Sequence, residues 1–179
     1  MRPALPLFAL GMFLITPWAS TAAHAEEDRW ADFRFLIGTW VSGGKPEDGS
    51  GRFSLEPDLQ GKVLVRRNSA SVPAAKGQAA AKHEDLMVVY SDARGEHFRA
   101  TYFDSEGHVI DYSVSPLPDK QGLVFVSNPK LPGPCFRLTY TKAAGGEVAV
   151  KFEIAPPGKA DQFRTYLQGL VKREEPARK

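Results

Sequence analysis

The chain has 179 residues, of which 42% are hydrophobic, 25% are charged and 11% are aromatic. Its length fits one domain with a sizeable core, and its single cysteine, Cys135, excludes an internal disulfide. The net charge is only +2, and no run of basic residues forms the extended positive surface that nucleic-acid-binding proteins use.

The first 25 residues have the features of a cleavable signal peptide. Arg2 supplies a positive charge, residues 4–15 are largely apolar, and Ala23-His24-Ala25 is a small-x-small cleavage site. The apolar run is shorter than the roughly 20 residues of a membrane-spanning helix. We therefore predict a periplasmic or secreted protein with no integral membrane segment after cleavage. Residues 26–179 would form the mature domain, with 22 basic and 21 acidic side chains.

Residues 26–37 are predicted to form a short helix. Trp30, Phe33 and Leu36 recur every third residue, and acidic residues stand in the first turn, where the helix dipole favours them. Gly38 follows as a stop signal.

The rest of the chain consists of short segments that are apolar throughout or alternate apolar and polar residues. These segments are separated by turn signals rich in Gly, Asp and Pro. Connections this short favour antiparallel neighbours, because a parallel pair needs a long crossover. The predicted strands lie near residues 39–43, 50–56, 62–72, 84–91, 96–104, 107–115, 122–128, 134–142, 146–155 and 162–173. The segment 73–82 lacks large apolar residues and is predicted to be a flexible surface loop.

The pattern favours an all-β fold that closes into a barrel. Val148, Val150, Phe152 and Ile154 share one face of their strand, and charged residues occupy the other. Closure removes the unpaired edges of such a long sheet. About ten strands enclose an interior slightly wider than side chains fill, which allows a ligand cavity.

The segment 35–40 contains Gly38-x-Trp40 at the start of the first strand, directly after the predicted helix. This resembles the entry motif of lipocalins and other calycin barrels. Together with segments 51–56, 61–66, 102–110 and 163–173, it is similar to a bacterial lipocalin-like family of unknown function, which is exported. The resemblance implies a single antiparallel barrel with a helix at its closed end. It also implies that Arg173, on the last strand, lies over the ring of Trp40 as a structural cation–π partner.

The same opening looks like that of nitrobindin-type haem barrels, which continue with further glycines in register and supply a histidine late in the chain. Here the later glycines are out of step and no histidine follows His108. We therefore predict no cofactor, and a haem-binding barrel remains a minor alternative.

The histidines do not predict a metal site. If the loop after Asp104 has two residues, His108 pairs with Phe103, and His97 lies six residues from Phe103 on its strand, roughly 20 Å away. His83 stands at the end of the flexible loop, where we expect it to be solvated. His83-Glu84-Asp85 alternates between faces, and the sequence contains no catalytic motif.

The leading hypothesis is a protein that binds a small hydrophobic or amphipathic ligand inside the barrel. The candidate binding residues are aromatic side chains on predicted strands and arginines whose inward charge would need a partner or an anionic ligand: Tyr90, Arg99, Tyr102, Phe125, Phe136, Arg137, Phe152 and Arg164. The same register makes Arg99 a cross-strand neighbour of Tyr112.

Two further classes of function stay open. A barrel filled by its own side chains would serve as a protein-interaction module, through an exposed face or the 73–82 loop. An enzyme would use Cys135 as a nucleophile, although the sequence shows no base beside it. The identity of the ligand and the oligomeric state are left undetermined.

Overall fold

The computed structural model describes residues 29–43, 50–74, 79–92, 95, 97–130 and 132–175. The predicted signal peptide, residues 1–25, lies outside this part of the chain.

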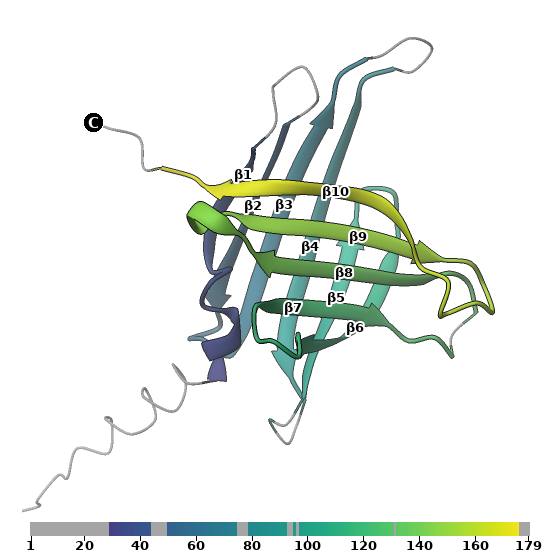
Figure 1. Ribbon diagram of the computed structural model, residues 1–179, viewed down its shortest axis with the longest axis horizontal. Coiled ribbons are helices and arrows are strands. Elements are labelled where there is room, and N and C mark those ends of the chain that lie inside the picture. Colours follow the sequence, from purple (N-terminus) through teal and green to yellow (C-terminus); the bar gives the residue numbers. More distant parts are fainter. Residues whose placement is uncertain are drawn as a thin grey trace, which may run out of the picture.

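Ten antiparallel strands form a closed barrel in which each strand pairs with its neighbours in sequence and β1 closes against β10 (Figure 1). The strands are β1 (Gly38–Ser42), β2 (Ser50–Asp58), β3 (Val63–Val72), β4 (Ala81–Ser91), β5 (Phe98–Asp104), β6 (Val109–Pro116), β7 (Gly122–Ser127), β8 (Cys135–Lys142), β9 (Val148–Ala155) and β10 (Arg164–Arg173). The predicted fold class is confirmed, and all ten strands lie where the alternation and the turn signals indicated. In Figure 1, β7–β10 cross in front of β2–β4.

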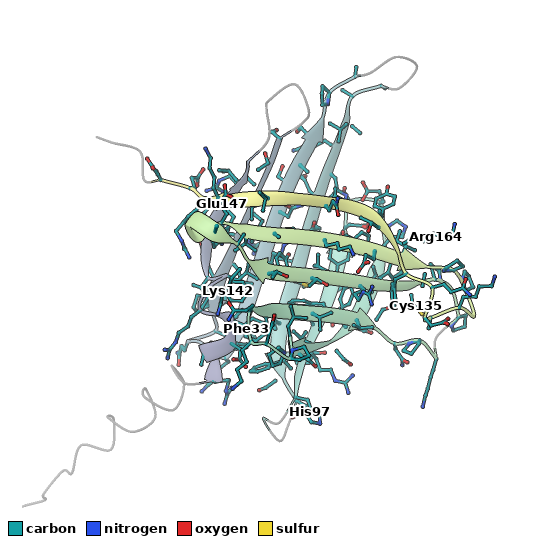
Figure 2. The ribbon with its side chains drawn as sticks, in the orientation of Figure 1. Phe33, His97, Cys135, Lys142, Glu147 and Arg164 are labelled. Atoms are coloured by element: carbon teal, nitrogen blue, oxygen red, sulfur yellow. The ribbon has the colours of Figure 1, made fainter. Side chains whose placement is uncertain are left out.

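One end of the barrel is covered by the segment before β1, and we call it the closed end. Trp30, Phe33 and Leu36 are buried there, and the ring of Phe33 lies 5.0 Å from that of Phe98 on β5. The indole of Trp30 donates to the carbonyl of Gly61 at 2.8 Å. These contacts fix the segment across the barrel base, as Figure 2 shows for Phe33.

This covering segment is shorter than the predicted helix over 26–37. Residues 26–28 lie outside the described residues, and the regular part is a 3₁₀-helix, η1 (Ala31–Phe33). A second 3₁₀ turn, η3 (Ala144–Gly146), joins β8 to β9. The spacing explains the difference at η1. Apolar residues that recur every third position align on a helix with three residues per turn, not on one with 3.6.

The first and last strands meet at a compact contact. The guanidinium carbon of Arg173 lies 4.5 Å from the centre of the Trp40 ring, the position that the resemblance implies. Arg173 also donates to the carbonyls of Ile37 at 2.8 Å and Phe35 at 3.3 Å. The Trp40 indole donates to the carbonyl of Leu36 at 2.8 Å. The end of β10 is thereby tied to the covering segment.

The hairpin between β5 and β6 differs from the prediction by one residue. Phe103 pairs with Val109, not with His108. The loop has three residues because Gly107 adopts a φ of 89° and its N–H donates to the carbonyl of Asp104 at 3.1 Å. A shift of one residue turns a side chain to the other face of a sheet. His108 therefore lies on the same face as Asp104.

Candidate functional site

The inner face of the barrel changes character along its axis. Near the closed end it is packed with buried side chains, among them Leu64, Val89, Leu123, Tyr140 and Val148. At the opposite end, which among the described residues no helical turn covers, polar groups gather on β3–β6. We call these the polar cluster: Arg66, Asn68, His83, Asp85, Tyr102, Asp104, Glu106 and His108.

The deepest part of the polar cluster is a buried ion pair. The guanidinium Nη1 of Arg66 bonds to Oδ1 of Asp85, and the side chains are 10% and 4% exposed. Asn68 donates to the other Asp85 oxygen at 2.8 Å. Burial lowers the pKa of Arg66, but Tyr140 and Asp85 raise it more, so the net direction is upward and Arg66 remains a cation.

Two buried polar atoms, between the packed closed end and the polar cluster, have no hydrogen-bond partner among the described residues: Nε of Arg66 and the hydroxyl of Tyr140. Tyr140 is fully buried, and burial raises the pKa of its phenol against the opposing effect of the nearby Arg66 guanidinium. Arg66 Cζ lies 5.1 Å from the centre of the Phe53 ring. A buried donor without a partner costs free energy, so this point of the interior favours an added hydrogen-bond acceptor.

His83 lies on the inner face and connects the deep pair to the rim. It belongs to β4, which begins at Ala81 and pairs His83 with Ala70. The expectation that His83 stands at the end of a loop is therefore wrong, although its side chain keeps 37% exposure to solvent. Its Nε2 lies 3.2 Å from Asp85 Oδ2 and its Nδ1 lies 2.9 Å from Glu106 Oε2. The predicted loop shortens because the β3–β4 ladder continues beyond the apolar residues.

At the rim, hydrogen bonds hold the carboxylate of Asp104 in one orientation. Its Oδ1 accepts the backbone N–H groups of His108 at 2.8 Å and Glu106 at 3.1 Å, and its Oδ2 lies 2.9 Å from Nδ1 of His108. Burial raises the pKa of Asp104, but the hydrogen bonds from His108 and Glu106 lower it more, so the carboxylate is ionised.

Tyr102 connects His83 with Asp104 within the polar cluster. Its hydroxyl lies 3.2 Å from His83 Nε2 and 3.3 Å from Asp104 Oδ2. Burial raises the pKa of Tyr102, and the charges of Asp85 and Asp104 raise it further. Tyr102 therefore stays protonated and acts as a hydrogen-bond donor.

The opposite part of the inner face, on β8–β10, is apolar and only half-buried. The rings of Phe136 and Phe152 stack with centres 6.0 Å apart, and Tyr166 meets Phe152 edge-on at the same distance. Leu167 pairs with Phe152 and is 56% exposed. We call these four residues the apolar wall. Figure 2 places Arg164, at the start of β10, at the end of the barrel away from Phe33.

The predicted binding residues divide between the two faces of the sheet. Tyr102, Phe136 and Phe152 lie on the inner face and are half-buried. Phe125 is also inward but belongs to the packed core, 1% exposed. Arg164 pairs with Ile154 at the rim and is exposed.

Three of the candidates lie on the outer face. Tyr90 pairs with Arg99 there. Arg99 faces Ser113, not Tyr112, because of the extra loop residue. Arg137 bonds to Glu153 at 2.7 Å and lies 4.1 Å from the centre of the Phe163 ring.

Cys135 lies at the start of β8 and is 3% exposed. It pairs with Ala155, which is fully buried, on the face opposite to Phe136 and thus opposite to the polar cluster. No group that could activate the thiol is found beside it among the contacts of the described residues. A buried thiol of this kind packs as a small apolar side chain.

Arg66 is a buried inward arginine that sequence reasoning did not select. The sequence of this strand allows two orientations, because Leu64 and Arg66 alternate with Val63 and Val65. Either set could face the interior, and the alternation alone does not show that Arg66 does. The spacing of His83 and Asp85 was a second signal, since residues i and i+2 of a strand share a face. Sequence reasoning tested only adjacent residues.

One ring nitrogen of His83 and one carboxylate oxygen each of Asp104 and Glu106 lie within 4.8 Å of one another. These are the described residues whose placement suits a metal ion. None of the described helical turns has the length and apolar character to cross a bilayer. No protein-family model matches the sequence, and no curated protein matches it.

Proposed function

We propose that this protein is exported and binds a small amphipathic molecule in the uncovered end of the barrel. The observation that carries the proposal is the division of the inner face into the apolar wall on β8–β10 and the polar cluster on β3–β6. An apolar chain or ring would lie on Phe136 and Phe152, which retain solvent exposure although they face inward. Removal of apolar surface from water gives about 25 cal/mol per Å².

The polar end of the ligand would carry a hydrogen-bond acceptor. Arg66 Nε and the Tyr140 hydroxyl are buried donors without partners among the described residues. The nearby acids Asp85 and Asp104 disfavour a second negative charge. A carbonyl, ester or amide oxygen therefore fits this environment better than a free carboxylate.

Native mass spectrometry of the protein purified from its own compartment, followed by solvent extraction, tests this function. We expect a stoichiometric added mass that belongs to a small amphipathic compound. A ligand-free mass that persists after incubation with a panel of lipids and aromatic esters would overturn the proposal and favour a protein-interaction module.

Two phenylalanine variants locate the binding surface. Phe152→Ala removes part of the apolar wall and should reduce the retained ligand at least tenfold. Phe103→Ala removes a ring on the outer face, where Phe103 is 41% exposed, and should leave retention unchanged. Equal retention in both variants would exclude the interior as the binding site.

A further inference from the structure

We propose that His83, Asp104 and Glu106 bind a divalent transition-metal ion, of the kind that Zn²⁺ represents, at the rim of the barrel. The three side chains come from β4, the end of β5 and the β5–β6 loop, and their ligand atoms lie within 4.8 Å of one another. This site is separate from the apolar wall and does not depend on the proposed amphipathic ligand.

The donor types decide the class of metal. An imidazole nitrogen combined with two carboxylate oxygens suits zinc and its first-row neighbours. Calcium and magnesium take oxygen ligands almost exclusively, so a histidine would be out of place in a site for either ion. The side chains of His83 and Glu106 are 37% and 46% exposed, which allows an ion to enter from solvent.

The surroundings of His83 match those of a metal-binding histidine. Its Nδ1 lies against Glu106, and its Nε2 lies 3.2 Å from Asp85 Oδ2. Histidines that bind metals commonly donate their second ring nitrogen to a carboxylate, which is itself held by hydrogen bonds. Asp85 meets this requirement through Arg66 and Asn68. We therefore assign Nδ1 to the metal and Nε2 to Asp85.

Asp104 is oriented before an ion arrives. Two backbone N–H groups hold its Oδ1, and its side chain is only 6% exposed. Its Oδ2 lies 2.9 Å from Nδ1 of His108, whose side chain is 65% exposed. Bonds of about 2.0–2.2 Å to a tetrahedral ion place ligand atoms about 3.3–3.6 Å apart. His83 Nδ1 and Glu106 Oε2 now lie 2.9 Å apart and all three ligand atoms lie within 4.8 Å, so the side chains need only short movements to reach these distances.

Charge balance also favours a dication. Arg66 neutralises Asp85 within the deep pair. Asp104 and Glu106 contribute two further carboxylates at the rim. A divalent ion cancels both and removes the repulsion between the two carboxylates.

The test is a calorimetric titration of the purified full protein with Zn²⁺, after dialysis against a chelator. We expect one Zn²⁺ per chain, bound at least tenfold more tightly than Ca²⁺ or Mg²⁺. His83→Ala and Glu106→Gln should each weaken Zn²⁺ binding at least tenfold. The matched controls are His97→Ala, near the closed end, and Glu84→Gln, on the outer face beside Lys82; both should bind as the unchanged protein does.

Several results would overturn the inference. Among them are no binding of Zn²⁺ above the controls, equal binding of Zn²⁺ and Ca²⁺, or binding that neither His83→Ala nor Glu106→Gln weakens. Circular dichroism checks that each variant is folded. If His83→Ala does not fold, Glu106→Gln decides the result, because Glu106 lies in an exposed loop. Cobalt(II) absorption gives a second readout, since loss of the imidazole ligand in His83→Ala should change the visible spectrum.

Discussion

The guanidinium of Arg173 occupies the space that a side chain at Gly38 would need. Nη1 of Arg173 lies in direct contact with the position of the missing Cβ, and Gly38 has a φ of 121°. The same guanidinium reaches the carbonyl of Ile37 and the ring of Trp40. The glycine is thus needed both for its backbone conformation and for its lack of a side chain.

We expect Gly38→Ala to destabilise the fold by at least about 1–3 kcal/mol. The new Cβ strains a backbone conformation that L-residues rarely adopt and displaces Arg173 from Trp40. Chemical denaturation followed by tryptophan fluorescence measures the change. Gly51→Ala is the matched control, because its added Cβ meets no atom within 4 Å, and it should be neutral or slightly stabilising. Equal stability of the two variants would contradict this account of the contact.

The buried pair of Arg66 and Asp85 should behave as a coupled unit. Arg66→Met or Asp85→Asn alone leaves one buried charge unpaired and is expected to cost about 3–5 kcal/mol. The double variant should cost less than the sum of the two, which a double-mutant cycle in urea measures. The exposed pair of Arg52 and Glu174 is the control, and its two single variants should show no measurable loss. Additive effects at Arg66 and Asp85 would contradict the pairing.

The stability of the fold should depend on pH through Glu153. Hydrogen bonds from Arg137 and Lys151 lower the pKa of Glu153 against the opposing effect of burial. A carboxyl whose pKa is depressed by folding stabilises the fold above its unfolded pKa of about 4.5, and this contribution is lost as the pH falls through the folded pKa.

We therefore expect Glu153→Gln to cost about 1–3 kcal/mol at pH 7 and progressively less toward pH 3. Urea denaturation of both proteins across this range checks the trend. Glu84→Gln removes an exposed carboxylate that pairs with Lys82 and should show no such dependence. A difference between Glu153→Gln and the unchanged protein that grows toward acid pH would refute the assignment.

The strands were predictable because their signals are local. Alternation in Val148 to Ile154 and turn residues such as Gly107 each report on a few neighbouring positions. The contact between Trp40 and Arg173 joins residues far apart in sequence, and only the resemblance to calycin barrels placed it. Periodicity alone has no means of pairing the first strand with the last.

The polar cluster was missed for a different reason. A single extra residue in the loop after Asp104 moves His108 to the inner face, and sequence patterns do not resolve loops to one residue. The reach of β4 back to His83 depends on backbone pairing with β3, where His83 is opposite Ala70, and not on apolar alternation. The site therefore depends on the β-sheet register, which hydrophobic patterns specify weakly where the side chains are polar.

The Tyr140 hydroxyl offers a final test that separates stability from binding. This hydroxyl is buried and has no hydrogen-bond partner among the described residues. An unsatisfied buried donor costs about 1–3 kcal/mol, so Tyr140→Phe should leave the ligand-free protein as stable as before or up to about 1 kcal/mol more stable. The same variant should retain less of the proposed ligand, because one donor to its acceptor oxygen is gone. Thermal unfolding and native mass spectrometry measure the two effects, and Tyr90→Phe, on the outer face of the barrel, serves as the control. A loss of more than about 1 kcal/mol in ligand-free Tyr140→Phe would mean that the hydroxyl is already bonded in solution and is not reserved for a ligand.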